Sequence, residues 1–274
     1  MIDLELIRLA LKEDLAGGED ITSIATISAD SNASADFVAR ADGIISGTAM
    51  AQAVMREVGL TDITEVRSDG STVRSGDILI SVNGNTRAIL LAERTALNFF
   101  CHLSGISTFT SKWVKEVAHT NCLVRDTRKT TPGMRLLEKY AVLKGGGTNH
   151  RMSLSDGALV KDNHIAAAGG VKKALSMVRA SHPAAEIEVE VDNLQQLAEI
   201  LTSKPDLVLL DNMSPSECAK AVSLVAGAFK LEASGGITLE NAKAFAESGV
   251  DFIAIGALTH SSPVFDIGLD LRVE

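Results

Sequence analysis

Short apolar segments alternate with amphipathic helical segments from about residue 105 to residue 260. The apolar segments are CLVRDT, GALVKDN, EIEVEV, DLVLLDN, KLEASGG and DFIAIGA. Continuous apolar strands separated by helices are typical of a parallel sheet covered by helices. At least six such units with glycine-rich strand ends favour a β/α barrel over an open doubly wound sheet. No GxGxxG follows an early strand, which weakens a dinucleotide-binding interpretation.

The first hundred residues have a mixed α/β pattern instead. Residues 4–15 have helical periodicity, and residues 48–59 predict a helix that ends at Gly59. Residues 37–47 predict a strand that enters a glycine turn, and residues 68–86 predict short strands joined by tight turns. The chain is long enough for a barrel with a smaller domain in front of it.

A long helix is predicted over residues 87–103. It is apolar on most sides, so we expect it to be buried. A single polar stripe runs along it at i, i+4 and i+8, formed by Arg94, Asn98 and His102. A buried arginine needs a partner. Either an internal ion pair or an anionic ligand would satisfy Arg94, and the pattern alone leaves both open.

Composition excludes several classes of protein. Of 274 residues, 46% are hydrophobic and 22% are charged, which is ordinary for a globular chain. The net charge of −9 argues against general nucleic-acid binding. No apolar run approaches the roughly 18 residues of a membrane span, and the acidic amphipathic N-terminus is unlike a signal or transit peptide. The three cysteines are far apart and form no CxxC pair. We therefore expect the protein to work in the reducing cytoplasm.

Positive charge is concentrated in one stretch. Eight Lys or Arg and only four Asp or Glu lie between Arg125 and His164. A basic segment in an acidic protein suggests a focused site for a small polyanion, although charge alone allows an ordinary solvated surface equally well.

The carboxyl ends of the predicted barrel strands are the most informative positions. In chain order they carry Arg128-Lys129, Lys161, Glu190, Asp211, Ser234-Gly235-Gly236 and Gly256. In a β/α barrel these ends converge on one mouth, where catalysis takes place. A buried strand that ends in a charged residue must find water, a partner or a ligand there. We therefore expect this set to form the active site.

The residue types suggest a division of roles. Arginine binds carboxylates through paired hydrogen bonds and lysine acts as a point charge for phosphates, whereas Glu190 and Asp211 suit Mg²⁺. The two late glycine turns, at Ser234–Gly236 and Gly256, suit phosphate. His150 is either a satisfied core histidine or a site residue, and its GGGTNHR context favours a loop and a site.

The neighbouring basic helix is less decisive. A helix is predicted from near Pro132 to Gly145, and Arg135 and Lys139 on it are second-tier candidates that would also serve as surface charge. Asp162 and His164 would either orient Lys161 or cap the turn after it.

The segment DTRKTTPGMRLLEKYAVLKGGGTNHRMSLSDGALVKDNHI resembles the central signature of the quinolinate phosphoribosyltransferases, type II phosphoribosyltransferases. The resemblance covers the whole chain. It includes LKEDL with DITS, LLAERTALNFF, HLSGISTFT, EVEVDNLQQL, LLDNMSP and EASGGITLENAKAFAESGVDFIAIGALTHSSPVFDIGLDL. One departure is Cys101-His102, where a Gln-Arg type of pair is more usual.

The resemblance implies two domains. It implies an N-terminal α/β sandwich over residues 1–104, joined by the C-terminal residues from about 265 to 274, and an incomplete β/α barrel over residues 105–264. It also implies a homodimer in which Arg94 completes the partner's active site.

Site residues follow from the resemblance position by position. Lys129, Lys161, Glu190 and Asp211 match catalytic positions, with Glu190 and Asp211 at the ribose and Mg²⁺. The contacts to quinolinate and phosphoribosyl pyrophosphate match Arg94, Thr127, Arg128, Lys129, His150, Arg151, Lys161, Glu190 and Asp211. The 5′-phosphate end matches Ser234, Gly235, Gly236, Gly256, Ala257 and His260.

The implied reaction converts quinolinate and phosphoribosyl pyrophosphate into nicotinate mononucleotide, pyrophosphate and CO₂ in NAD synthesis. Two anionic substrates that meet in one pocket repel each other, so an excess of cations at the mouth fits this chemistry. Two alternatives are a related phosphoribosyltransferase with another anionic acceptor and a non-catalytic ligand-binding barrel. The complete charged mouth speaks against the second.

Overall fold

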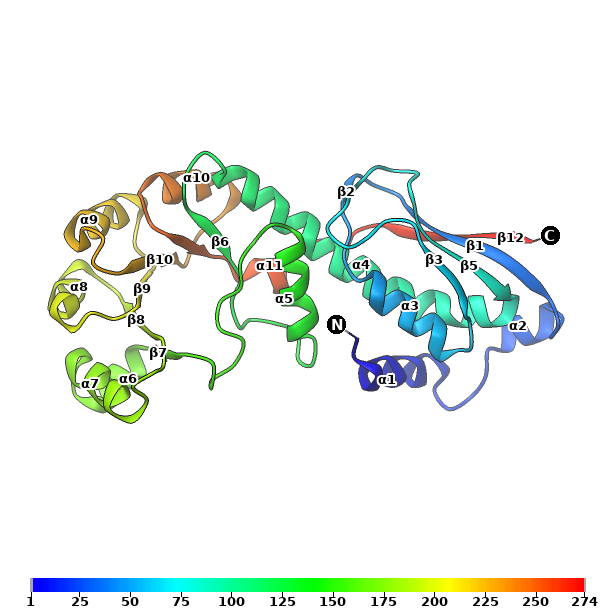
Figure 1. Ribbon diagram of the computed structural model, residues 1–274, viewed down its shortest axis with the longest axis horizontal. Coiled ribbons are helices and arrows are strands. Elements are labelled where there is room, and N and C mark those ends of the chain that lie inside the picture. Colours follow the sequence, from blue (N-terminus) through cyan, green and yellow to red (C-terminus); the bar gives the residue numbers. More distant parts are fainter. Residues whose placement is uncertain (1, 274) are drawn as a thin grey trace. The chain divides into compact units, whose positions relative to one another are not determined.

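The computed structural model describes residues 2–273 and divides the chain into two compact units. The first comprises residues 1–111, 131–146 and 261–274, and the second comprises residues 112–130 and 147–260. Figure 1 labels the elements of both units. No helix within residues 2–273 combines the length and the apolar character needed to cross a membrane.

The first unit is built around an antiparallel sheet with the order β12-β1-β5-β3. The strands are β1 (Asn32–Ala39), β3 (Asp62–Glu65), β5 (Ile78–Asn85) and β12 (Ile267–Val273). A two-stranded sheet pairs β2 (Gly43–Ile44) with β4 (Thr72–Val73). The last strand of the chain therefore pairs with the first, with Ala39 opposite Ile267.

Helices complete this unit. They are α1 (Leu4–Leu15), α2 (Ile21–Thr26), α3 (Thr48–Glu57), α5 (Arg135–Lys144) and most of α4 (Thr86–Val117). The rings of Phe37 on β1 and Phe100 on α4 are 6.5 Å apart, and both side chains are buried between the sheet and the helix. This apolar layer is the core of the first unit, and it accounts for the apolar character of α4.

The second unit holds a six-stranded parallel sheet with the order β6-β11-β10-β9-β8-β7. Its strands are β6 (Leu123–Arg125), β7 (Ala158–Val160), β8 (Ile187–Val191), β9 (Leu207–Asp211), β10 (Lys230–Ser234) and β11 (Phe252–Ala254). An isolated parallel bridge joins Arg125 to Thr148 beyond β6. Because β6 and β7 stand at opposite edges, the barrel is incomplete, as predicted.

Helices follow the strands on the outside of this curved sheet (Figure 1). They are α6 (Asp162–Ala168), α7 (Val171–Ser181), α8 (Leu194–Ile200), α9 (Pro215–Val225), α10 (Leu239–Glu247) and the short α11 (Ala257–His260). Alternation along each strand turns one set of side chains to the helices and the other to the barrel interior. The predicted fold class, an incomplete β/α barrel plus an N-terminal α/β sandwich, is confirmed.

Three local predictions were wrong. The helix predicted over residues 87–103 continues to Val117, through Gly105, where a Cβ atom would lie 2.3 Å from the Pro263 carbonyl oxygen. The glycine therefore serves a close backbone approach and does not end the helix. The helix predicted from Pro132 begins at Arg135, because a turn with Gly133 at φ +82° precedes it. Arg94 is exposed, although burial was predicted for it.

Candidate active site

A cavity of about 390 Å³ opens at the carboxyl ends of the parallel strands, entirely within the second unit. It is lined by Thr127, Arg128, Lys129, His150, Arg151, Leu159, Lys161, Glu190, Leu209, Asp211, Glu232, Ser234 and Ala254. Most of the charged strand-end residues singled out in the sequence are thus brought together. The volume is within the range of small-molecule sites.

Lys161 stands directly after β7 and faces an acid from the next strand. Its Nζ lies 3.0 Å from Glu190 Oε2 on β8. The Lys161 main-chain N–H donates to His164 Nδ1 at 3.0 Å, so His164 caps the first turn of α6. Of the two roles considered for His164, the structure supports the cap.

Two arginines in the cavity, Arg128 and Arg151, are cations of this site that form no ion pair within the described residues. Among the described residues, no carboxylate forms an ion pair with Arg128 or Arg151, and the Nε atom of each is buried without a hydrogen-bond partner. Burial lowers the pKa of Arg151 and the positive charge of Arg128 lowers it further, while the carboxylates of Glu188 and Asp156 offset part of the effect. Two partly buried cations held close together are a demanding arrangement unless an anion joins them.

The acidic side of the cavity is formed by Glu190 and Asp211. Asp211 ends β9, and its Oδ2 accepts a hydrogen bond of 2.7 Å from the side chain of Asn212. Asn212 has φ +54°, so the chain turns sharply here and leaves the Asp211 carboxylate at the strand end. Carboxylate oxygens on neighbouring strands are donors that Mg²⁺ accepts.

Glycine at position 235 is required by this turn. Gly235 has φ +89°, and a Cβ atom on it would lie 2.1 Å from Asn212 Oδ1. Gly236 has φ +63° and faces open space. With Ser234, these two glycines leave the main chain bare at the end of β10.

The predicted phosphate segment continues at the end of β11. Gly256 lies against the side chains of Lys129 and His260, since a Cβ atom on it would be 3.0 Å from Lys129 Cδ and 3.2 Å from His260 Nε2. Ala257 and His260 belong to α11, and Thr259 Oγ1 donates to the Lys129 carbonyl at 2.8 Å. Thr127 Oγ1 accepts from the Lys129 N–H at 3.1 Å and shapes the turn after β6.

Sequence reasoning missed a buried charged layer below this mouth, formed by Arg125, Glu188 and Glu232. Arg125 Nη1 lies 2.9 Å from Glu232 Oε2, and its guanidinium carbon is 3.6 Å from the centre of the Phe252 ring. Each acid stands two residues before a strand-end residue, Glu188 before Glu190 and Glu232 before Ser234. Polar residues at this spacing point to the same face of a strand, which is the signal that reveals the layer.

Glu232 gives a pH-dependent stability. Burial raises its pKa to about 7, and the nearby Glu188 carboxylate adds to the effect. The native state therefore holds a proton that the unfolded chain releases above pH 4.5, its ordinary pKa.

We therefore expect the free energy of unfolding to fall as pH rises from 4.5 to about 7 and to level off above that pH. Glu232→Gln should flatten this dependence, since glutamine does not titrate. Urea unfolding of both proteins at several pH values between 4 and 8 measures the two slopes. Identical slopes would contradict the assignment.

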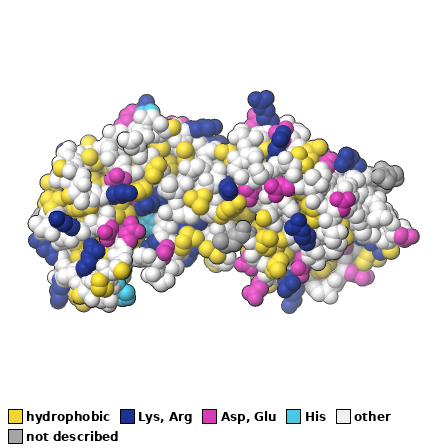
Figure 2. All heavy atoms as spheres, in the orientation of Figure 1, with side chains coloured by type: hydrophobic (Ala, Val, Ile, Leu, Met, Phe, Trp, Pro, Cys, Tyr) yellow, Lys and Arg dark blue, Asp and Glu magenta, His cyan; other side chains and the backbone are white. Residues whose placement is uncertain are grey.

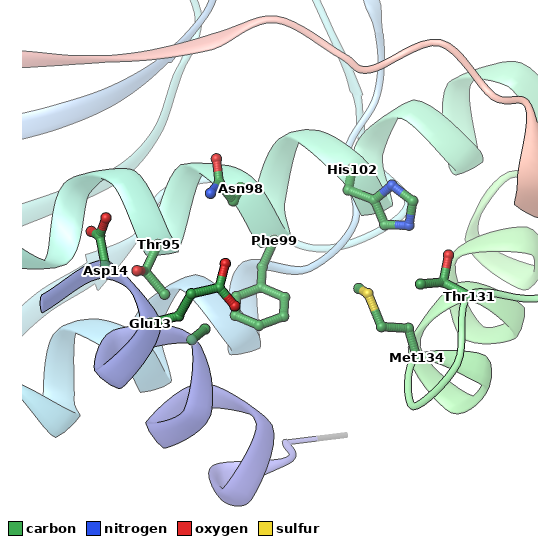
Figure 3. Close-up of a pocket in the computed structure, with 9 residues that line it drawn as sticks. Glu13, Asp14, Thr95, Asn98, Phe99, His102, Thr131 and Met134 are labelled. Carbon is green, nitrogen blue, oxygen red and sulfur yellow. The ribbon is translucent and has the colours of Figure 1, made fainter. Parts of the chain in front are cut away.

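The first unit has a pocket of its own, of about 450 Å³, between α1 and α4. Figure 3 shows Thr95, Asn98, Phe99 and His102 along α4, opposite Glu13 and Asp14 of α1. His102 Nε2 lies 2.9 Å from Glu138 Oε1, and Glu138 is fully buried. The unusual His102 thus serves a structural pair with α5.

Charged groups of both signs are interspersed over the face shown in Figure 2. Arg94 forms no ion pair with any of the residues described, so the internal ion pair considered for it is absent from the single chain.

Comparison with known proteins identifies the family. The model of the quinolinate phosphoribosyl transferase N-terminal domain matches residues 20–104, and that of the C-terminal domain matches residues 106–270. The chain belongs to the quinolinate phosphoribosyl transferase family. The resemblance drawn from the sequence is confirmed, and the chain is accordingly a phosphoribosyltransferase.

Individual members of the quinolinate phosphoribosyl transferase family are similar over nearly their whole length. The nicotinate-nucleotide pyrophosphorylase (carboxylating) of Mycobacterium leprae is 48% identical, with 97% of this chain and 96% of the relative covered. The solved structure of the nicotinate-nucleotide pyrophosphorylase from Francisella tularensis has a TM-score of 0.93 at 40% identity, covering 98% and 95% of the two chains. The Ehrlichia chaffeensis enzyme has a TM-score of 0.94 at 38% identity, covering 98% of each.

Proposed function

We propose that the cavity at the carboxyl ends of the parallel strands transfers a phosphoribosyl group from phosphoribosyl pyrophosphate to quinolinate. Loss of CO₂ then gives nicotinate mononucleotide, with pyrophosphate as the other product, in NAD biosynthesis. The observation that carries this proposal is the presence in one cavity of two guanidinium groups, Arg128 and Arg151, that form no ion pair with a carboxylate of the described residues. An acceptor with two carboxylates supplies the charge that this pair lacks.

Quinolinate binding follows from the cations. Arginine holds a planar carboxylate through two parallel hydrogen bonds, so Arg128 and Arg151 suit the two adjacent carboxylates of the pyridine. Lys161 is half-exposed and paired with Glu190, so it can exchange that partner for a substrate oxygen without a large desolvation cost. Held in this way, the pyridine nitrogen is oriented toward the ribose carbon that it attacks.

The second substrate is proposed to extend toward the glycine turns. The bare main chain at Gly235 and Gly236, with His260 nearby on the Gly256 side, suits the 5′-phosphate. Lys129 lies against Gly256 and suits the departing pyrophosphate as a point charge.

Glu190 and Asp211 are proposed to hold Mg²⁺. Their oxygen donors fit this ion, which keeps several waters and shares the remaining positions with substrate oxygens. When bound, the ion supplies charge neutralisation for the leaving pyrophosphate. The carboxylates themselves stabilise the positive charge that develops on the ribose as the pyrophosphate departs.

The chemistry needs little acid–base help from the protein. The pyridine nitrogen forms a bond to the ribose carbon as the bond to pyrophosphate breaks, which leaves a positive ring nitrogen. The adjacent carbon then loses CO₂, and the electron pair left behind is stabilised by that nitrogen until a proton arrives. Positioning and electrostatics are therefore the contributions of the chain.

A homodimer with shared sites completes the proposal. Arg94 is exposed on α4 and has no ionic partner among the residues that the structure describes, so it is available to the anionic substrates of a partner subunit. An isologous dimer would place each Arg94 in the other subunit's cavity. We propose a cytoplasmic location, since the three cysteines are free.

Removal of Arg151 tests the acceptor assignment. We expect Arg151→Ala to weaken quinolinate binding by about 1.5–3 kcal/mol, the scale of a hydrogen bond to a charged group. Nicotinate, with one carboxylate, should bind the wild-type protein much more weakly than quinolinate, because it leaves part of the cation cluster unpaired. Isothermal calorimetry with both acids measures the affinities, and Arg67→Ala, at an exposed position, is the control. Equal affinities for the two acids would refute the proposal.

A further inference from the structure

The buried layer below the cavity contains a carboxylate that the proposed chemistry does not use. Glu188 is 5% exposed and stands on β8 two residues before Glu190. Its neighbour Glu232 is already paired with Arg125 at 2.9 Å. Glu188 Oε2 instead lies 2.6 Å from His150 Nε2, which is the shortest contact of the layer among the described residues.

The main chain determines which nitrogen of His150 carries the proton. The Arg151 main-chain N–H lies 2.8 Å from His150 Nδ1, and a main-chain N–H can only donate. Nδ1 must therefore present its lone pair, and the ring proton must sit on Nε2, where it is donated to Glu188. His150 is thereby a neutral ring with both nitrogens engaged inside the protein.

A metal ion is a poor alternative occupant of this layer. His150, Glu188 and Glu232 each offer a ligand atom, and these atoms lie within 4.8 Å of one another. Ligation through Nε2 would move the ring proton to Nδ1, however, where it would face the Arg151 main-chain N–H. The positive charge for the layer already comes from Arg125.

Room for water adjoins the buried layer. A small cavity of about 70 Å³ is lined by Arg125, His150, Arg151 and Glu188, among others. It exceeds the roughly 10–15 Å³ that one water requires. Glu188 Oε1 is itself buried and has no hydrogen-bond partner among the described residues.

Arg151 is consequently fixed from both sides. Its N–H is held by the His150 ring, and its Nη1 donates to the Gly157 carbonyl at 2.7 Å. The His150 N–H in turn donates to Asp126 Oδ1 at 2.9 Å. These bonds set the path of the main chain from which the Arg151 guanidinium enters the cavity.

We propose that Glu188 is a positioning residue for acceptor binding, acting through the neutral Nε2–H form of His150 to fix Arg151. The inference rests on the proposed function and adds to it, since it gives His150 an orienting role in place of a cationic contact with a substrate carboxylate. Outer partners that orient a binding group commonly matter about as much as the group itself.

Nitrogen-15 NMR of the imidazole rings tests the tautomer in the wild-type protein. The chain has six histidines, and the His150→Asn spectrum identifies the His150 signals. At neutral pH, with and without saturating quinolinate, we expect an unprotonated Nδ1 and a protonated Nε2. An imidazolium in the quinolinate complex would overturn the inference. Failure of quinolinate to bind at all, seen in the same titration, would instead count against the proposed function.

Variants of Glu188 test the positioning role. Glu188→Ala should raise the quinolinate Kd about tenfold or more and leave the KM for phosphoribosyl pyrophosphate unchanged. Glu188→Gln should recover part of the affinity, because its amide oxygen still accepts from Nε2–H. Glu199→Gln, exposed on α8, is the matched control. Unchanged quinolinate affinity in Glu188→Ala, or an equal loss for both substrates, would overturn the inference.

Discussion

Refolding an equal mixture of the Arg94→Ala and Lys161→Ala variants should restore about a quarter of the wild-type activity, although each variant alone should be nearly inactive. Random reassortment makes half of the dimers mixed. In each mixed dimer one site carries both defects and the other carries neither, if Arg94 acts in the partner's cavity. One intact site of two, in half of the dimers, leaves a quarter of the active sites intact.

The position of Arg94 lets this experiment separate a loss of activity from a loss of stability. Arg94 is exposed and forms no ion pair within the described part of the chain, so its replacement should cost little stability. Arg74→Ala, at another exposed position of the first unit, should retain full activity. Native mass spectrometry is the control that shows whether mixed dimers form. Mixed dimers without recovered activity would mean that Arg94 serves its own subunit, or none.

Removal of divalent metal should abolish turnover, and Mg²⁺ or Mn²⁺ should restore it. The expectation follows from the hard oxygen donors of Glu190 and Asp211 and from two anionic substrates that must approach each other. Asp211→Asn should reduce kcat strongly and leave the quinolinate Kd unchanged, because its proposed role is at the other substrate. Full activity in metal-free buffer would contradict this assignment.

The residues at the mouth of the barrel could be predicted because charged residues follow directly after short apolar strands. Each parallel strand is a short apolar run, so Lys161, Glu190 and Asp211 at the strand ends stand out clearly. The alternation of strands and helices then requires these ends to meet at one edge. Nothing in this argument depended on tertiary detail, and the cavity does contain these residues.

The buried layer was missed because the sequence argument considered only the last residue of each strand. Glu188 and Glu232 lie inside runs that otherwise suggest an ordinary core. Only their spacing of two residues from a site residue marks them as facing the barrel interior. Their pairing with His150 and Arg125 joins residues distant in sequence, and no local pattern specifies such partners.

The exposure of Arg94 and the full length of α4 also required the structure. A helix that is apolar on most sides is expected to be buried all round. The core of the first unit covers α4 through residues such as Phe100, and it leaves Arg94 and Asn98 uncovered. Gly105 suggests a break, whereas its role is to admit the main chain at Pro263.

Steady-state turnover with quinolinate and phosphoribosyl pyrophosphate tests the central claim most directly. We expect nicotinate mononucleotide, CO₂ and pyrophosphate in equal amounts, with nicotinate a far poorer acceptor. Arg128→Ala and Arg151→Ala should each lower kcat/KM for quinolinate, since both cations are needed to hold two carboxylates. Comparable turnover of nicotinate, or product formation without release of CO₂, would contradict the assignment of this cavity as a quinolinate site.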